Sequence, residues 1–447
     1  MTASTGHELS PERERATLAT ISRRVMPLVV VGYVMAYLDR IDVGYAQLGM
    51  GTELGISAAA YGVAAGIFFI AYFICEVPSN LMLRRFGSRV WLGRIMITWG
   101  LISAAMVFVH SLNALLVLRF LLGVAEAGFF PGIILYLVSW FPENRRSVAL
   151  GWLILAQPVA YILGGSVGGL ILEHVHWFGL SSWRWVFFLP GAATFVVGLV
   201  TLFKLPESPA RVKWLDDDQK RWLTATLDAE QGPPPNHGIR AQLAALRERR
   251  VLHLAAIFFM VQTGDYGFSF FLPLIIKQIN PEYSDTNIGL AAALPFVAAG
   301  VFTVVLARAG ARAKEQRMYI LGPVLLTILG LVIVVLYKDQ SVPAMFGICL
   351  TSVGVYAWGP AFFTMASMSI SRTQAAVGIA VVNSIGNLGG FVGPYVVGLS
   401  ADKGPTQGMI LSIIPLVVTV VLLLVWRTPR VQPGSEASVA ELSQIPG

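Results

Sequence analysis

Charged residues are scarce in this sequence. Asp, Glu, Lys and Arg make up only 13% of its 447 residues, whereas soluble globular proteins carry roughly 25%. So little charge excludes an ordinary soluble protein, because the chain lacks the polar side chains that cover a water-exposed surface. Cysteine is also rare, and the two residues, Cys75 and Cys349, both lie inside apolar runs. This pattern excludes a disulfide framework.

Several functional motifs are missing as well. The long polar connection at 205–250 has no metal-ligand spacing, no phosphate-binding glycine loop and no nucleophile elbow. His174 and His176 form a short pair with no third metal ligand nearby. It also contains nothing that resembles a nucleic-acid-binding module. We therefore expect neither an enzyme nor a metal site, and no nucleic-acid partner.

Apolar residues, in contrast, form 55% of the chain. A bilayer core of about 30 Å takes about 20 apolar residues per helix, so twelve helices account for most of them. We therefore predict an all-α, multi-pass membrane protein. The expected transmembrane helices are 25–46, 58–82, 89–109, 113–137, 147–172, 184–204, 251–277, 288–308, 318–337, 343–366, 375–399 and 408–426.

One long connection divides these helices into six and six. The predicted organisation is a tail, a first six-helix bundle, a linker, a second bundle and a second tail, at 1–24, 25–204, 205–250, 251–427 and 428–447. The linker has apolar residues at helical spacing, followed by a breaker at Gly232-Pro233-Pro234-Pro235. These apolar residues are Trp214, Leu215, Trp222, Leu223 and Leu227. The linker is then either an interfacial helix with a hinge or a solvated connection with no role of its own.

An internal repeat supports the division. Leu-Gly-Gly-Ser-Val-Gly-Gly at 163–169 recurs as Leu-Gly-Gly-Phe-Val-Gly-Pro at 388–394. The two copies fall at the fifth position of each half, as a duplicated bundle predicts. Small residues at this spacing serve helix packing. We expect two pseudo-symmetric bundles with a pathway between them, as in secondary transporters.

The distribution of basic residues sets the expected orientation. Of the 32 Lys and Arg residues, the connections on the side opposite to the termini hold only Arg184, Lys277, Lys338 and Lys403. Cytoplasmic loops of membrane proteins carry the excess of Lys and Arg. Both termini are therefore expected in the cytoplasm.

Ionisable residues inside the predicted spans are the best candidates for function, because each costs about 2.5 to 3.5 kcal/mol on insertion scales. At about 1.5 Å per residue, Arg40 lies about 21 Å from the inner membrane edge and Arg119 about 9 Å from the outer edge. In a hydrocarbon slab of about 30 Å these depths coincide. The candidates are Asp39, Arg40, Asp42, Arg119, Glu126 and Asp265.

Two guanidinium groups at one depth suit an organic anion, since arginine offers a fixed fork of donors to a carboxylate. Glu126 lies two helical turns from Arg119, so both residues share one face. A carboxyl whose proton affinity changes when an anion binds nearby would couple the two events, and Asp39 and Glu126 are placed for this. The alternative is a structural network in which these charges only neutralise one another.

Other polar and aromatic residues in the spans are weaker candidates. Tyr37 lies one helical turn from Arg40 and shares its face. The remaining candidates either line a cavity or make hydrogen bonds between helices. They are Tyr72, Gln157, Gln262, Trp358 and Asn383.

Several motifs together resemble the anion:cation symporter family of the major facilitator superfamily. They include Tyr37-Leu38-Asp39-Arg40-Ile41-Asp42, the run from Arg119 through Glu126 to Phe130-Pro131-Gly132, and Trp183-Arg184-Trp185. The fourth is Asn383-Ser384-Ile385-Gly386-Asn387-Leu388-Gly389-Gly390 with Gly393-Pro394. The resemblance extends from about residue 20 to residue 430.

The resemblance implies roles for individual residues. Arg40 matches the arginine that binds the substrate carboxylate, Asp39 and Glu126 match the proton-coupling acids, and Arg119 matches the arginine paired with them. Tyr37, Tyr72 and Gln157 match cavity-lining positions, as Gln262, Trp358 and Asn383 do less closely. Asp265 matches no family role, and Asp42 stands where asparagine is common. The loops after the second and eighth spans lack the acid usual in the superfamily.

The resemblance also implies an activity. Members of the family take up sugar acids, tartrate, phthalate, hydroxyphenylacetate and related carboxylates, commonly with protons. We therefore expect a monomeric, proton-coupled importer of an organic carboxylate in a bacterial inner membrane, with the proton as coupling ion and no other cofactor. The alternatives are an anion exchanger or uniporter on the same fold, and a membrane-bound sensor.

Overall fold

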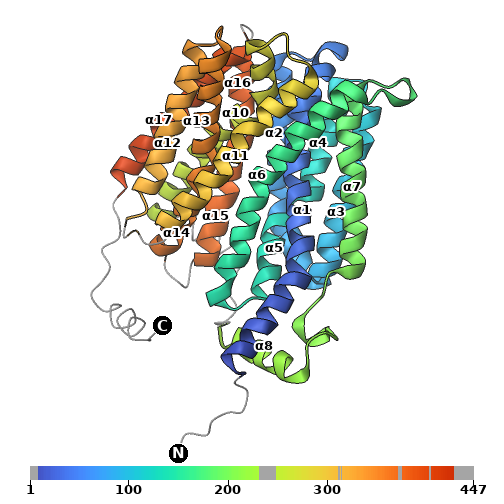
Figure 1. Ribbon diagram of the computed structural model, residues 1–447, viewed down its shortest axis with the longest axis vertical. Coiled ribbons are helices and arrows are strands. Elements are labelled where there is room, and N and C mark those ends of the chain that lie inside the picture. Colours follow the sequence, from blue (N-terminus) through green and yellow to red (C-terminus); the bar gives the residue numbers. More distant parts are fainter. Residues whose placement is uncertain are drawn as a thin grey trace, which may run out of the picture.

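The computed structural model describes residues 9–230, 248–310, 313, 315–370, 375–401 and 404–426. Within these ranges, twelve helical segments are long and apolar enough to cross a membrane, which confirms the predicted all-α fold (Figure 1). Short 3₁₀ turns lie at Met106–Phe108, Trp177–Gly179 and Pro209–Arg211. The α-helices are α1 (Pro11–Glu53), α2 (Ala58–Phe86), α3 (Ser88–Ala105), α4 (Leu112–Glu126), α5 (Phe129–Val138), α6 (Glu143–His174), α7 (Ser182–Lys204), α8 (Asp217–Glu230), α10 (Arg249–Ile279), α11 (Asp285–Gly310), α12 (Met318–Leu336), α13 (Ser341–Ala357), α14 (Gly359–Ser369), α15 (Ala375–Asn387), α16 (Gly389–Ser400) and α17 (Pro405–Val425).

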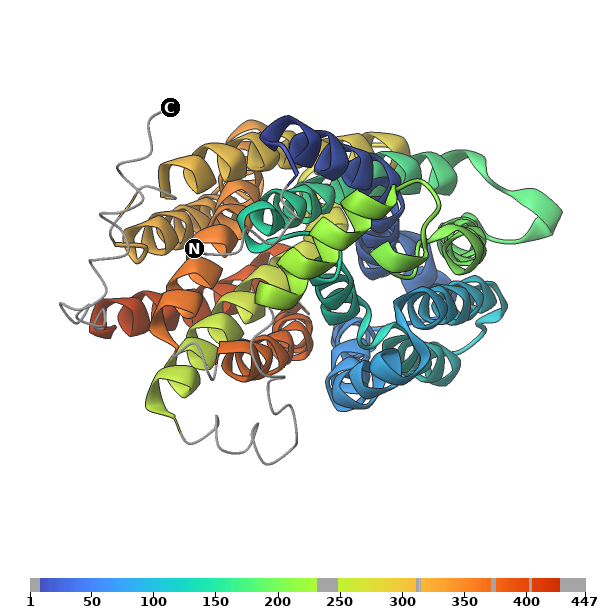
Figure 2. The ribbon, with the colours of Figure 1, turned by 90° about the horizontal axis from the view of Figure 1, so that it is seen from below.

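The helices form two halves. Helices α1–α7 make the first half and α10–α17 the second, and the halves meet where α6 packs on α11 and α2 packs on α16. In Figure 2 the blue-to-green half and the yellow-to-red half lie on opposite sides of the molecule. Helix α8 lies across the end face, and we call this end of the bundle the linker end.

The first helix begins earlier than predicted. The expected span was 25–46 after a tail at 1–24, but α1 is helical from Pro11 and has 43 residues. At about 1.5 Å per residue it is about 64 Å long, twice the thickness of a bilayer core. Its start is capped by Ser10, whose side chain accepts a hydrogen bond from the Arg13 backbone N–H.

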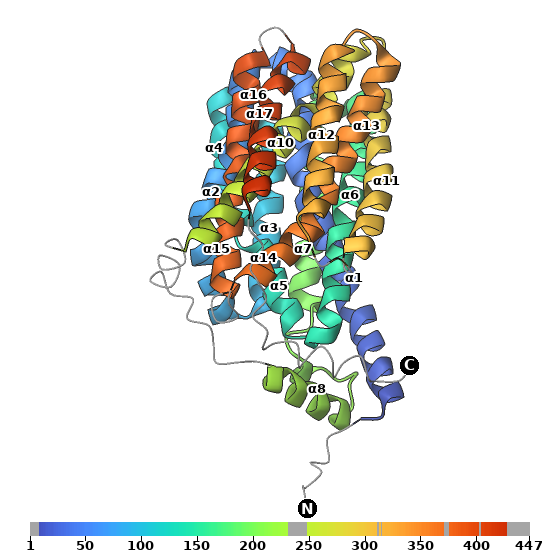
Figure 3. The ribbon, with the colours of Figure 1, turned by 90° about the vertical axis from the view of Figure 1, so that its left-hand side faces the viewer.

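The linker forms a helix as its apolar spacing predicts. Helix α8 buries Trp222, Leu223 and Leu227. It is tied to the extension of α1, because Arg13 donates to Asp216 at 3.0 Å and Gln219 donates to Thr17 at 2.9 Å. Figure 3 shows α8 beside the first turns of α1, below the bundle. The predicted breaker at 232–235 lies outside the described residues.

Three spans are interrupted where continuous helices were predicted. The breaks fall at Ala127–Gly128, at Trp358 and at Leu388. Gly128 has φ of +83°, and a Cβ there would collide with the side chain of Ser79. Only glycine adopts this conformation without strain, so the break follows directly from the residue type. Glu126 ends the helix before the first break, and Trp358 occupies the second.

The two halves are packed most closely at the end opposite to α8. Glycines on α2 and α6 lie against backbone atoms of the other half, so that a Cβ on Gly62 would collide with the Pro394 carbonyl. A Cβ on Gly165 would likewise collide with the Gly289 carbonyl. Glu173 accepts a hydrogen bond from the Thr286 N–H at 2.9 Å. Glycines of both repeat segments therefore serve close packing between helices.

Candidate functional site

A buried ion pair joins α1 to α4 in the middle of the first half. The Arg40 Nη2 and Nε atoms donate to one oxygen of Glu126, at 2.6 and 3.0 Å. The Glu126 side chain is fully buried, and the Arg40 side chain is 11% exposed. The second oxygen of Glu126, Oε2, has no hydrogen-bond partner among the described residues. Glu126 thus binds the Arg40 guanidinium through one carboxylate oxygen, while its other oxygen accepts no hydrogen bond from the described residues.

Aromatic rings surround the guanidinium of Arg40. Its Cζ atom lies 5.2 Å from the Tyr37 ring centre, 5.4 Å from Phe68 and 5.5 Å from Tyr72. Such distances allow cation–π attraction, which strengthens when water is excluded. The structure therefore brings together Arg40, Glu126, Tyr37 and Tyr72 from the sequence candidates.

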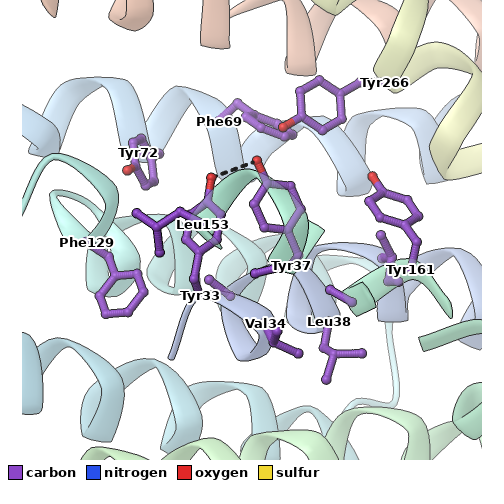
Figure 4. Packing of buried hydrophobic residues seen from close by; sticks show 14 of the residues in the cluster. Tyr33, Val34, Tyr37, Leu38, Phe69, Tyr72, Phe129, Leu153, Tyr161 and Tyr266 are labelled. Atoms are coloured by element: carbon purple, nitrogen blue, oxygen red, sulfur yellow. Dashed lines mark hydrogen bonds between the residues drawn. The ribbon is translucent and has the colours of Figure 1, made fainter. Parts of the chain in front are cut away.

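Further tyrosines, which were not among the residues predicted from the sequence, extend this cluster of rings around Arg40, and we call the whole cluster the aromatic wall. In Figure 4 the hydroxyls of Tyr33 and Tyr37 point toward Phe69 and Tyr266, which come from α2 and α10. Tyr161 packs against both Tyr37 and Tyr356, with ring centres 6.4 and 5.3 Å apart. The spacing of Tyr33 and Tyr37, one turn apart on the face of Arg40, was readable from the sequence. The contacts that cross between the halves were not.

Arg119 does not share an open surface with Arg40, in contrast to the expected pair of guanidiniums. It is fully buried and donates to the carbonyls of Ala64 and Ala65 on α2, both at 3.3 Å. Its Cζ atom lies 5.5 Å from the ring centre of Phe68, the same ring that packs on Arg40. The two arginines thus contact the same ring, as their matching depths suggest. Arg119, however, directs its guanidinium to Phe68 and to the backbone carbonyls of α2.

Two acids of α1, the helix that carries Arg40, are also buried. Asp39 and Asp42 are each 2% exposed. Both oxygens of Asp39, and Oδ2 of Asp42, have no hydrogen-bond partner among the described residues. A buried carboxylate without a donor is costly in its charged form. Both residues therefore have the surroundings of groups that bind a proton.

Among the described residues, no hydrogen bond joins the predicted residues of the other helices to Arg40 or Glu126. Trp358 donates its Nε1–H to Oδ2 of Asp265 at 2.9 Å, so these two residues form a buried pair within the second half. No residue pattern had assigned a role to Asp265. Gln157 on α6, Gln262 on α10 and Asn383 on α15 are half-buried. The short hydrogen bonds of the Arg40 guanidinium, at 2.6 and 3.0 Å, both go to Glu126.

A polar contact also crosses between the halves. Ser384 on α15 donates to Oε2 of Glu76 on α2 at 3.0 Å. Glu76 is 4% exposed and lies one turn along α2 from Tyr72. The aromatic wall and this contact therefore lie side by side, on the linker side of the close glycine packing.

The comparisons with known proteins agree with this architecture. The sequence model of the Major Facilitator Superfamily matches residues 29–283 and 254–445. The chain belongs to the major facilitator superfamily. It is 37% identical, over 96% of its length and 99% of the relative's, to the "Putative tartrate transporter" of Agrobacterium vitis. This superfamily protein is therefore a multi-pass membrane transporter, and not an enzyme.

Other relatives differ in the names that they carry. The chain is 35% identical to the "Quinolone resistance transporter" of Acinetobacter baumannii, over 92% of the chain and 95% of that protein. It is 33% identical to the "Inner membrane transport protein RhmT" of Escherichia coli, over 83% and 86%. A bacterial homologue of the lysosomal transporter Spinster has the same fold, with a TM-score of 0.72 at 15% identity over 93% of the chain and 97% of that structure. These likenesses favour the inner membrane of a bacterium.

Proposed function

We propose that this superfamily protein is a proton-coupled importer of an organic carboxylate. The observation that carries the proposal is the buried Arg40–Glu126 pair, in which Nη2 and Oε1 lie 2.6 Å apart. Arg40 cannot deprotonate at physiological pH. It must therefore be neutralised by a carboxylate at every stage, and both Glu126 and a substrate anion meet that need.

Competition for one guanidinium supplies the coupling. When Glu126 binds a proton, its hold on Arg40 weakens and the guanidinium becomes available to a carboxylate of the substrate. When the substrate leaves, Glu126 loses its proton and pairs with Arg40 again. Substrate and proton then bind together, because each favours the state that the other requires. Asp39, whose two carboxyl oxygens have no hydrogen-bond partner among the described residues, is placed to bind a further proton.

The membrane potential makes this coupling necessary. Moving one negative charge inward against 100 mV, negative inside, costs about 2.3 kcal/mol. Accumulation of a monoanion therefore needs compensating positive charge, and with two candidate proton carriers we propose that more than one proton enters with each monoanion. Asp39 and Glu126 are the two carriers that we propose.

Transport follows from rocking of the two halves, with both termini in the cytoplasm and the protein acting as a monomer. The close packing of Gly62 and Gly165 on the other half supports a state that is shut at the end opposite to α8. With α8 in the cytoplasm, this state opens inward. Release of the substrate carboxylate to the cytoplasm would then restore the Arg40–Glu126 pair.

The substrate is a small carboxylate whose body lies against aromatic rings. Tyr37, Tyr72 and Tyr266 can pack on a sugar-acid chain or on an aromatic acid. The relative named for tartrate transport supports a hydroxylated acid. A thermal-shift screen of tartrate, sugar acids and aromatic acids separates these classes, because a ligand at 100 times its Kd stabilises by about 2.7 kcal/mol.

The test of coupling uses the purified protein in liposomes with the best ligand of that screen. A pH gradient alone, acid outside, is expected to drive uptake above the equilibrium level. An exchanger would take up substrate only when the liposomes are preloaded with anion, and a uniporter would never exceed equilibrium. Either of these results would contradict the proposal.

A further inference from the structure

A groove of about 290 Å³ lies between the first turns of α1 and the first turns of α6. Its wall is largely apolar and includes Leu18, Met26 and Trp152, while Arg15 and Arg145 also line it. The groove belongs to the first half and is separate from the Arg40–Glu126 pair. None of the features that support transport makes use of it.

The groove lies at the depth where lipid headgroups meet their acyl chains. The membrane-spanning part of α6 begins at Val148, and Arg145 precedes it by one helical turn. Val148 and Trp152 are each 57% exposed, as expected of side chains that face lipid. On α1, eleven residues separate Arg15 from Met26, which is about 16 Å along the helix. The groove thus runs from a basic mouth in the headgroup region to an apolar floor at the edge of the hydrocarbon.

The two arginines at the mouth have no carboxylate partner among the described residues. Their neighbours in the sequence do, since Arg13 pairs with Asp216 and Arg146 pairs with Glu230. Arg15 and Arg145 are exposed, and no described acid lies within 4 Å of either guanidinium. The acids on the same helical turns are Glu12, Glu14 and Glu143.

We propose that this groove binds an anionic phospholipid. The guanidiniums of Arg15 and Arg145 hold the phosphate, because arginine donates pairs of hydrogen bonds to phosphate oxygens. The first part of an acyl chain lies along Val148 and Trp152. Basic clusters at the cytoplasmic membrane surface attract anionic lipids in this way. A zwitterionic lipid has no net negative charge, so Arg15 and Arg145 are expected to bind it less tightly than an anionic lipid.

Lipid selectivity of the purified full-length protein tests the proposal. Native mass spectrometry compares retention of phosphatidylglycerol with that of phosphatidylcholine, and glycerol phosphate serves as the soluble anion. The unaltered protein is expected to prefer phosphatidylglycerol. The double variant Arg15→Gln/Arg145→Gln is expected to bind it roughly 30-fold less tightly.

A matched control removes the same charge elsewhere. Arg23→Gln/Arg24→Gln lies on α1 but outside the groove, and it is expected to keep the preference. Trp152→Ser is expected to weaken phosphatidylglycerol binding without creating affinity for glycerol phosphate. Thermal unfolding without lipid checks that every variant folds.

Three outcomes would overturn the proposal. The groove variant would keep its preference if the lipid bound elsewhere. The control would lose as much affinity as the groove variant if only overall charge mattered. Glycerol phosphate would displace the lipid at equal concentration if the site served a soluble anion.

Discussion

Arg40 and Arg119 contact the same ring, that of Phe68, with Cζ-to-centre distances of 5.4 and 5.5 Å. Only Arg40 pairs with a carboxylate; Arg119 donates to two backbone carbonyls of α2. Two residues of one type at one depth therefore have different partners. This difference predicts different consequences when each is substituted.

Arg40→Lys is expected to impair binding while leaving the fold intact. Lysine keeps the charge but loses the planar fork that holds a carboxylate. Removing such a charged hydrogen bond typically costs about 1.5 to 3 kcal/mol, which is roughly a 10- to 100-fold rise in Kd. Isothermal titration with the best ligand of the screen measures it, and Arg23→Lys serves as control. An unchanged Kd would remove Arg40 from the binding site.

Arg119→Gln is expected to act on stability instead. Its loss leaves the Ala64 and Ala65 carbonyls with one donor fewer in a buried position. These carbonyls keep their backbone hydrogen bonds within α2, so the expected cost is that of the lost hydrogen bonds to a charged group, about 1.5 to 3 kcal/mol. A lower thermal unfolding midpoint with substrate affinity kept within about threefold is the expected result. Lost affinity at full stability would instead place Arg119 against the substrate.

Close packing of the halves predicts a conformational effect of Gly165→Ala. A Cβ at Gly165 would meet the Gly289 carbonyl of α11, whereas a Cβ at Gly151, on the same helix, meets nothing within 4 Å. Gly165→Ala should therefore hold the halves apart at the end opposite to α8. Spin labels at the exposed positions His176 and Asn287 measure this separation, in a background without the two cysteines. Equal distances in Gly165→Ala and Gly151→Ala would show that this packing does not control closure.

The docking of α8 on α1 is expected to depend on pH. The backbone N–H of Gln219, and then the Arg13 side chain, lower the pKa of Asp216. A carboxyl whose folded pKa is depressed adds stability above its unfolded pKa of about 4, and this stability is lost as the pH falls through the folded value. Asp216→Asn should mimic that loss at pH 7. Hydrogen exchange of α8 amides measures it, and equal exchange in the variant would deny Asp216 this role.

The sequence allowed the twelve spans to be predicted because hydropathy alone determines where a chain can cross a bilayer. The start of α1 at Pro11 was missed because its first turns are polar, although a serine cap followed by proline is a helix-start signal. The break at Gly128 was missed for a related reason, since neither its positive φ nor the neighbouring Ser79 affects hydropathy.

The pairing of the charges could be predicted only in part. Depth matched Arg40 with Arg119, and Glu126 joined the same site through the helix face that it shares with Arg119. The direct Arg40–Glu126 contact was not predicted, because two helical turns from Arg119 place the carboxyl at a different depth. Whether Arg119 faces a cavity or a backbone carbonyl depends on the distance between α2 and α4. The spacing of residues within one helix does not determine that distance. The Asp265–Trp358 hydrogen bond joins residues 93 positions apart, and it was missed because the contact depends on how α10 packs against the break before α14.

The most direct test of the account is proton-driven uptake by Glu126→Gln in liposomes. Glutamine keeps the size and an acceptor for Arg40 but cannot exchange a proton. We expect this variant to bind substrate and to exchange it across the membrane, yet to lose accumulation driven by a pH gradient. Glu282→Gln, at an exposed position, should accumulate substrate normally. Normal pH-driven accumulation by Glu126→Gln would contradict the claim that this carboxylate couples proton to anion.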